Sequence, residues 1–87
     1  MLVTMSPKAV RFVRTAARLP TGVVDAVRRC TLINDRCHLR CTLFDASTLR
    51  EWLHAQAEAT RSRRPAIADI LATAANDVGK AIALDQP

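Results

Sequence analysis

The chain has 87 residues and a mass of 9.6 kDa, which allows one small domain with a single core. Hydrophobic residues make up 49% of the sequence and aromatic residues only 3%, so alanine supplies much of the apolar content and closely packed helices are favoured. The formal net charge is +5, carried mostly by arginine. This composition excludes collagen-like, low-complexity and fully disordered chains, and the short length argues against a large catalytic cleft.

The first predicted helix begins at Pro7. Ser6 can act as its N-cap, and proline is favoured at the first helical position. Apolar residues then recur at helical spacing as far as Leu19, and residues 20–22 are expected to end the helix. The cations on its opposite side are Lys8, Arg11, Arg14 and Arg18.

A β-hairpin is predicted next. Apolar and polar side chains alternate strictly over residues 37–43, which is the period of a half-buried strand, and residues 27–33 are rich in strand-forming types. Asn34 and Asp35 lie between these two runs. Both residue types tolerate positive φ, so they predict a two-residue hairpin turn.

The register of this hairpin places Leu32 opposite Cys37 and Arg29 opposite Arg40. Like charges directly opposite each other destabilise a sheet, and a protein tolerates them most readily where an anionic partner relieves the repulsion. In an alternative interpretation, residues 23–31 form a second helix instead of a strand.

The C-terminal half predicts two helices. Asp45 or Ser47 is expected to cap the first, residues 61–64 form a basic linker, and Pro65 starts the second. Because the linker is short, the two helices are expected to pack antiparallel. The second helix is apolar enough either to be the central core helix or to support a homodimer. The residues expected on the apolar side of the first helix are Leu49, Trp52, Leu53 and Ala57.

Together these elements predict a single α+β domain over residues 1–87 in the order α-β-β-α-α. A two-stranded antiparallel hairpin would pack on the antiparallel helical pair, and residues 1–5 and 85–87 would be frayed tails. If residues 23–31 are helical, the fold becomes an all-α four-helix arrangement.

The charge is uneven along the chain. Residues 1–44 hold eight basic residues against two acidic ones, a net +6, whereas residues 45–87 hold five basic and six acidic residues, a net −1. Arginine binds phosphate or carboxylate through two parallel hydrogen bonds, so the N-terminal half predicts a surface for an anionic partner. A solvated helix face is the simpler alternative. The predicted contact residues are Lys8, Arg11, Arg14, Arg18, Arg29, Arg36 and Arg40.

No catalytic or metal chemistry is expected. The spacing of Cys30, Cys37, His38 and Cys41 matches no common zinc pattern, and adjacent residues 37 and 38 would point to opposite faces of a strand. These cysteines are expected to be small buried hydrophobes. The sequence contains no glycine-rich phosphate loop and no pair of carboxylates spaced for acid–base catalysis, so we expect neither an enzyme, a cofactor nor a small-molecule substrate.

The cysteine count and the termini predict a cytoplasmic protein. A secreted disulfide scaffold normally has a larger and even number of cysteines, whereas this chain has three. The apolar stretch before Pro7 is too short for a signal-peptide core, and charged residues interrupt residues 66–84, so no membrane span is expected.

We therefore expect a small basic regulatory protein that acts by binding. Its arginine-rich N-terminal face would dock on nucleic acid or on a nucleoprotein complex. Phe12 and Trp52 lie on apolar faces and are expected to be core residues, which argues against base stacking. The alternative is a protein–protein interaction module, such as a phage- or plasmid-encoded inhibitor of a host complex, which docks on an acidic protein surface or forms a homodimer through its helical pair.

Overall fold

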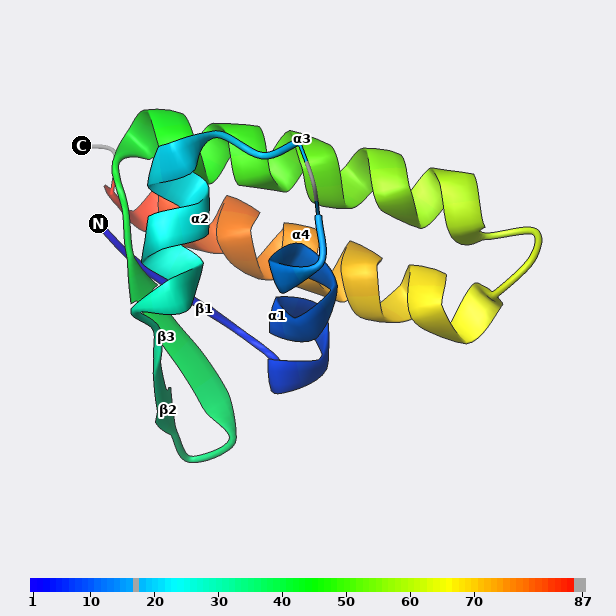
Figure 1. The fold of residues 1–87 in the computed structure, drawn as a ribbon, viewed down its shortest axis with the longest axis horizontal. Helices are drawn as coiled ribbons and strands as arrows, with labels where there is room; N and C mark the ends of the chain where they lie inside the picture. The colour runs from blue at the N-terminus through cyan, green and yellow to red at the C-terminus, as the bar shows by residue number, and fades with distance from the viewer. Residues whose placement is uncertain (17, 86–87) are drawn as a thin grey trace.

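A computed structural model describes residues 1–16 and 18–85 of the chain. The fold is α+β, as predicted, with a three-stranded sheet and four helices in the described residues, so the all-α alternative is wrong (Figure 1). In chain order, the elements are β1 (Leu2–Met5), α1 (Pro7–Arg14), α2 (Thr21–Arg28), β2 (Thr31–Ile33), β3 (Arg36–Arg40), α3 (Leu43–Thr60) and α4 (Pro65–Asp85).

Strand β1 was not predicted. It pairs antiparallel with β3, with Val3 opposite Leu39 and Met5 opposite Cys37, and the sheet order is β1-β3-β2. Val3 and Met5 are fully buried, so the expected frayed tail over residues 1–5 is wrong. A four-residue alternation is too short to stand out in the sequence, but it is long enough to complete a sheet when β3 offers a free edge. In the other expected tail, Asp85 ends α4, and residues 86–87 lie outside the described residues.

The two interpretations of residues 23–44 each describe part of the structure. The hairpin turn is confirmed at Asn34 and Asp35, which have φ of 51° and 61°, and Leu32 does lie opposite Cys37. The strand over residues 27–30 is wrong, because Val27 belongs to α2 and is buried. Burial of an i, i+3, i+4 face of α2 against the core outweighs the strand propensity of these residue types.

Helix α1 begins as predicted and ends early. The Ser6 side-chain oxygen accepts a hydrogen bond from the backbone N–H of Ala9 at 3.3 Å, as expected for an N-cap. At the other end the backbone N–H of Thr15 donates to the carbonyl of Phe12, a bond that tightens the last turn. Arg18 therefore lies in the connection to α2 and not on a helix face.

Helices α3 and α4 lie side by side and run antiparallel, as predicted (Figure 1). The cap of α3 is Thr42, whose hydroxyl oxygen accepts from the N–H of Asp45 at 3.1 Å, so the expected caps at residues 45 and 47 are wrong. Leu49, Leu53 and Ala57 are buried on its inner side, as predicted. In α4, Val78 is fully buried, which makes this helix a central part of the core.

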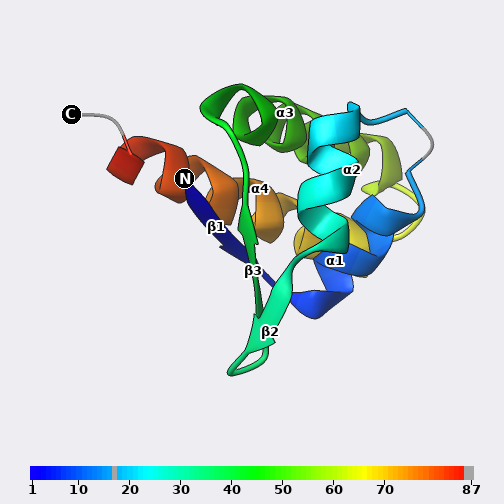
Figure 2. The ribbon, with the colours of Figure 1, turned by 60° about the vertical axis from the view of Figure 1, so that its left-hand side comes forward.

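One face of the sheet packs into the core and the other is open (Figure 2). Helix α4 lies beside β1, and α2 packs against both α1 and α3. Among residues 1–16 and 18–85, no helix combines the length and the apolarity needed to cross a membrane.

Candidate functional site

The seven predicted cations do not form one surface. Arg36 is already engaged in contacts within the protein. Its Nη2 donates to Oδ2 of Asp77 on α4 at 2.8 Å and to Oγ1 of Thr4 at 3.3 Å. The two charged side chains are 38% and 20% exposed, so this ion pair is partly shielded from solvent. Its role is to join β3 to α4, and Arg36 is removed from the candidate site.

Arg29 and Arg40 do share a groove, although not as partners in a strand pair. Arg29 is the C-cap of α2, and Arg40 ends β3. Both line a groove of about 810 Å³ on the open face of the sheet, which we call the sheet groove. Two carboxylates, Asp25 and Asp45, line the same groove. Because these two carboxylates offset the two arginines, the sheet groove is a poorer candidate for a polyanion than a groove without carboxylates.

Arg14 is exposed and contacts Cys30, which follows the end of α2. Its Nη2 donates a hydrogen bond to Cys30 Sγ at 3.7 Å. With Arg28 and two valines of α2, it lines a small hollow of about 230 Å³ between α1 and α2. The predicted cationic face of α1 is therefore reduced to Lys8 and Arg11, both of which are exposed.

A different groove, where α1 meets the α3–α4 hairpin, brings aromatic and cationic side chains together. We call it the aromatic groove. It has a volume of about 550 Å³ and draws residues from α1, from α3 and from the start of α4. As expected, Phe12 and Trp52 pack against the core, but both are only partly buried and both also line this groove. Its lining consists of Phe12, Thr15, Ala16, Trp52, Gln56, Ala59, Thr60, Arg63, Arg64, Ile67 and Leu71.

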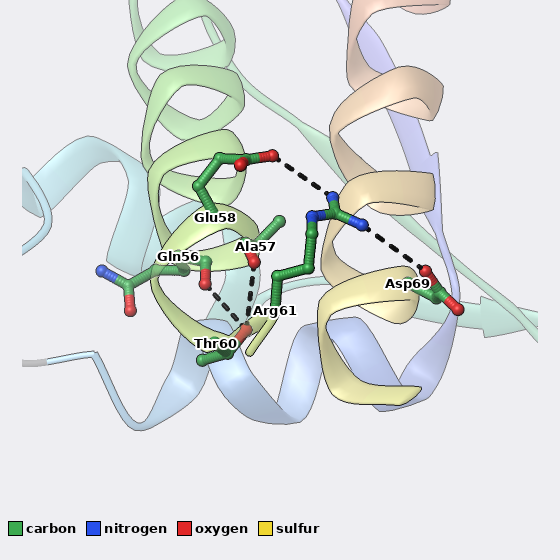
Figure 3. Close-up of polar contacts among 6 residues, drawn as sticks. All are labelled: Gln56, Ala57, Glu58, Thr60, Arg61 and Asp69. Atoms are coloured by element: carbon green, nitrogen blue, oxygen red, sulfur yellow. Dashed lines mark hydrogen bonds and ion pairs between the residues drawn. The ribbon is translucent and has the colours of Figure 1, made fainter. Parts of the chain in front are cut away.

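The aromatic groove carries positive charge without a compensating negative one. None of the described residues that line it is acidic, and its two charged residues, Arg63 and Arg64, are exposed. Arg61, in the same basic linker, behaves differently. It is 3.3 Å from Glu58 and 4.0 Å from Asp69, so its positive charge is offset by these two carboxylates (Figure 3).

Two cations of α1 are neighbours of Phe12, which lines this groove. At about 100° per residue, Lys8 and Thr15 are adjacent to Phe12 on the helix surface, and Arg11 lies just beyond them. Arg63 and Arg64 line the groove, whereas Lys8 and Arg11 do not line it and lie on the neighbouring surface of α1. We call these four cations the basic rim: Lys8, Arg11, Arg63 and Arg64.

The sequence patterns did not assign the two linker arginines or the two aromatic residues to a binding site. Arg63 and Arg64 were expected to be a linker, and the two aromatic residues were assigned to the core. The run of arginines was a visible signal, but nothing in the spacing of residues 12, 52 and 63 brings them together. Only the packing of α1 against the helical hairpin does so.

The cysteine and histidine cluster does not provide a metal site. Cys37 is buried, whereas Cys41 lies at the sheet groove with His38. Within the part of the chain that the structure describes, no group of three or more His, Cys, Asp or Glu residues is placed to hold a metal ion.

Comparison of the chain with protein-family models, with curated proteins and with solved structures finds no match. Function is therefore inferred from the two grooves and their charges.

Proposed function

We propose that this protein is a small accessory factor that binds single-stranded nucleic acid. Bases enter the aromatic groove, and phosphates contact the basic rim. The observation that carries the proposal is the pairing of two partly exposed aromatic side chains with two exposed arginines, Arg63 and Arg64, in one groove whose described lining holds no acidic residue.

The chemistry of a single strand matches this arrangement. Unpaired bases stack on aromatic side chains, and each stacked base contributes about 1–3 kcal/mol of binding free energy. Arginine presents two parallel N–H donors to a phosphate. A groove of about 550 Å³ is in the ordinary range for small-molecule pockets, so it can receive a base.

We expect binding to depend little on base sequence. Stacking and phosphate contacts hold a strand in place without reading the edges of its bases. The only uncharged polar side chains in the groove are Thr15, Gln56 and Thr60 among the described residues. The Thr60 hydroxyl already donates to the backbone carbonyl of Gln56 at 2.9 Å (Figure 3). The protein would therefore bind along a single strand and would not select a particular base sequence.

A protein partner is the second candidate function. The sheet groove favours it, because Leu2 and Ile33 line that groove and remain 51% and 47% exposed. Apolar side chains between charges of both signs are typical of a protein interface. This surface would suit an inhibitor of another complex, on an acidic patch of a host protein or in a homodimer.

Trp52 is the only tryptophan of the chain, so its fluorescence reports directly on the aromatic groove. The first experiment is a titration of the purified protein with an oligothymidylate and an oligouridylate across a salt series. We expect the Trp52 emission to be quenched. We also expect log affinity to fall linearly with log salt, with a slope of about −0.7 per phosphate contacted.

A matched pair of double variants distinguishes binding in the aromatic groove from binding in the sheet groove. Arg63→Glu with Arg64→Glu removes half of the basic rim, and Arg29→Glu with Arg40→Glu makes the same charge change in the sheet groove. The first should weaken binding roughly tenfold or more and make the salt slope shallower by about 1.4. The second should leave the slope unchanged. If both double variants lost the same affinity, binding would depend on net charge alone. If Trp52 fluorescence were not quenched, the nucleic acid would not bind in the aromatic groove.

A further inference from the structure

Strand β2 is the open edge of the sheet. The strand order β1-β3-β2 leaves one side of β2 unpaired, whereas β1, at the other edge, lies beside α4. Among the described elements, β2 packs mainly on β3, and the β2–β3 hairpin projects from the body of the molecule (Figure 2). An uncovered strand edge is a template for pairing with a strand of another chain.

The register of the hairpin decides which backbone groups face this edge. In a hairpin with a two-residue turn, the residues that flank the turn exchange hydrogen bonds, and here these are Ile33 and Arg36. Hydrogen-bonded and non-hydrogen-bonded pairs alternate along an antiparallel ladder. Thr31 therefore bonds to His38, and the N–H and C=O of Leu32 point to the free edge. A donor and an acceptor on one residue can bond reciprocally to the same residue of a second copy.

The side chains of β2 favour contact at this edge. Leu32 is 61% exposed and Ile33 is 47% exposed. Leu32 lies on the same face of the sheet as Cys37, and Ile33 lines the sheet groove on the other face. Natural proteins commonly block an exposed edge with a charged residue or a proline, and β2 contains neither. Both faces of β2 therefore present apolar surface that a neighbouring strand would cover.

The charges at the two ends of β2 are complementary. Arg29 precedes the strand and Asp35 lies in the turn that follows it. Both are exposed, and no ion pair among the described residues involves either of them. An antiparallel pairing centred on Leu32 places Arg29 of each copy beside Asp35 of the other. An in-register parallel pairing would instead bring like charges together, which destabilises a sheet.

We propose that this protein forms a two-fold symmetric homodimer through β2, a property independent of nucleic-acid binding in the aromatic groove. The two three-stranded sheets join into one antiparallel sheet of six strands. The Leu32 residues of the two copies exchange hydrogen bonds, and Ile33 of each copy packs beside Thr31 of the other. A two-fold axis makes every contact occur twice. Because three residues a side make a small interface, the dimer is weak, with a Kd on the order of 100 µM.

Sedimentation equilibrium of the full chain tests the proposal, at concentrations from about 10 µM to about 1 mM, which bracket this Kd. We expect a monomer–dimer equilibrium. Amide hydrogen exchange followed by NMR then locates the interface. Exchange of the Leu32 amide should slow several-fold at the higher concentration, whereas the Ile33 amide, bonded within the hairpin, should change little. A chain that stays monomeric would overturn the proposal and leave the edge to an extended segment of another protein. A dimer with unchanged Leu32 exchange would overturn it too, in favour of another exposed apolar surface such as that at Phe44 and Leu84.

Charge-reversal variants test the antiparallel register. Arg29→Glu and Asp35→Lys each place like charges side by side at both ends of the homodimer, so each should weaken it about tenfold. An equimolar mixture of the two variants should regain the wild-type Kd, because the mixed dimer brings opposite charges together at both ends. Arg50→Glu is the control, since it makes the same charge change at an exposed position of α3 and should leave the Kd unchanged.

Thermal unfolding of each variant checks that the hairpin is intact, because Asp35 has positive φ and Arg29 does not. If Asp35→Lys is unfolded, the comparison of Arg29→Glu with Arg50→Glu still decides the outcome. Equal Kd values for these two variants, or a mixture of folded variants that does not recover, would contradict the pairing of Arg29 with Asp35.

Discussion

The carboxylate of Asp45, in the first turn of α3, occupies the space in which residue 22 would carry a Cβ atom. Gly22 lies in the first turn of α2, where unpaired backbone N–H groups give a helix partial positive charge. A negative carboxylate is favourable there. The glycine is retained for this close approach and not for an unusual backbone conformation, because its φ is not positive.

The Gly22→Ala variant tests how much the close approach of Asp45 to residue 22 contributes to stability. Alanine is favoured over glycine within a helix by about 1 kcal/mol, but its Cβ would displace the Asp45 carboxylate. Loss of the favourable carboxylate position offsets the gain from alanine, so we expect the stability of the variant to stay within about 0.5 kcal/mol of the wild type in urea denaturation. In an Asp45→Ala background the same change should be stabilising. Equal effects in the two backgrounds would show that the two residues are not coupled.

Among the elements, the β2–β3 hairpin depends most on its turn. Asn34 and Asp35 both adopt the left-handed region, which suits a two-residue turn between twisted strands. β2 has only three residues, and all of them are exposed, so side-chain burial contributes little to its pairing with β3. The backbone conformation of the turn is therefore a large part of what holds β2 in register.

Substitutions at Asp35 test the turn. Asp35 is exposed, so replacing it removes no buried contact. Asp35→Gly should stabilise the protein by about 0.5 kcal/mol because glycine adopts positive φ without strain. Asp35→Val should destabilise it by about 1–2 kcal/mol because a β-branched residue disfavours that region. Denaturant midpoints compare the two, and equal stability of the two variants would contradict a role for positive φ.

The molecule as a whole depends on one core to which every element except the edge strand β2 contributes buried residues. Several elements are short: α1 and α2 have eight residues each, and β1 has four. Isolated segments of this length are not stable in water, so they exist because they bury an apolar face against α3 and α4. Loss of the core should therefore unfold the chain as a unit.

Val78→Asp tests this cooperativity. Val78 is fully buried, and an unpaired carboxylate there costs several kcal/mol, which is comparable to the whole stability of a small domain. We expect the variant to lose its far-ultraviolet circular dichroism signal and its cooperative thermal transition. Asn76→Asp is the control, because it places the same charge on an exposed position of α4. A folded Val78→Asp protein with an altered oligomeric state would instead make Val78 an interface residue.

Local signals in the sequence were sufficient for several features. The Ser6-Pro7 start of α1, the Pro65 start of α4 and the turn at Asn34 and Asp35 all depend on residues within a few positions of each other. The apolar repeat of α4 extends over several turns, so its helical period is clear in the sequence. Such features are set by backbone stereochemistry and by the need of a long amphipathic helix to bury one side.

The other features of the structure depend on contacts between segments that are far apart in the sequence. β1 exists because Met5 meets Cys37, and Arg36 is removed from the charged surface by Asp77, which is 41 residues away in the chain. The aromatic groove and its basic rim likewise combine α1 with the far end of the helical hairpin. A charge pattern in the sequence shows how many cations a chain carries. Which of them stay unpaired and face the same groove depends on contacts between distant segments, and those contacts form only when the common core assembles.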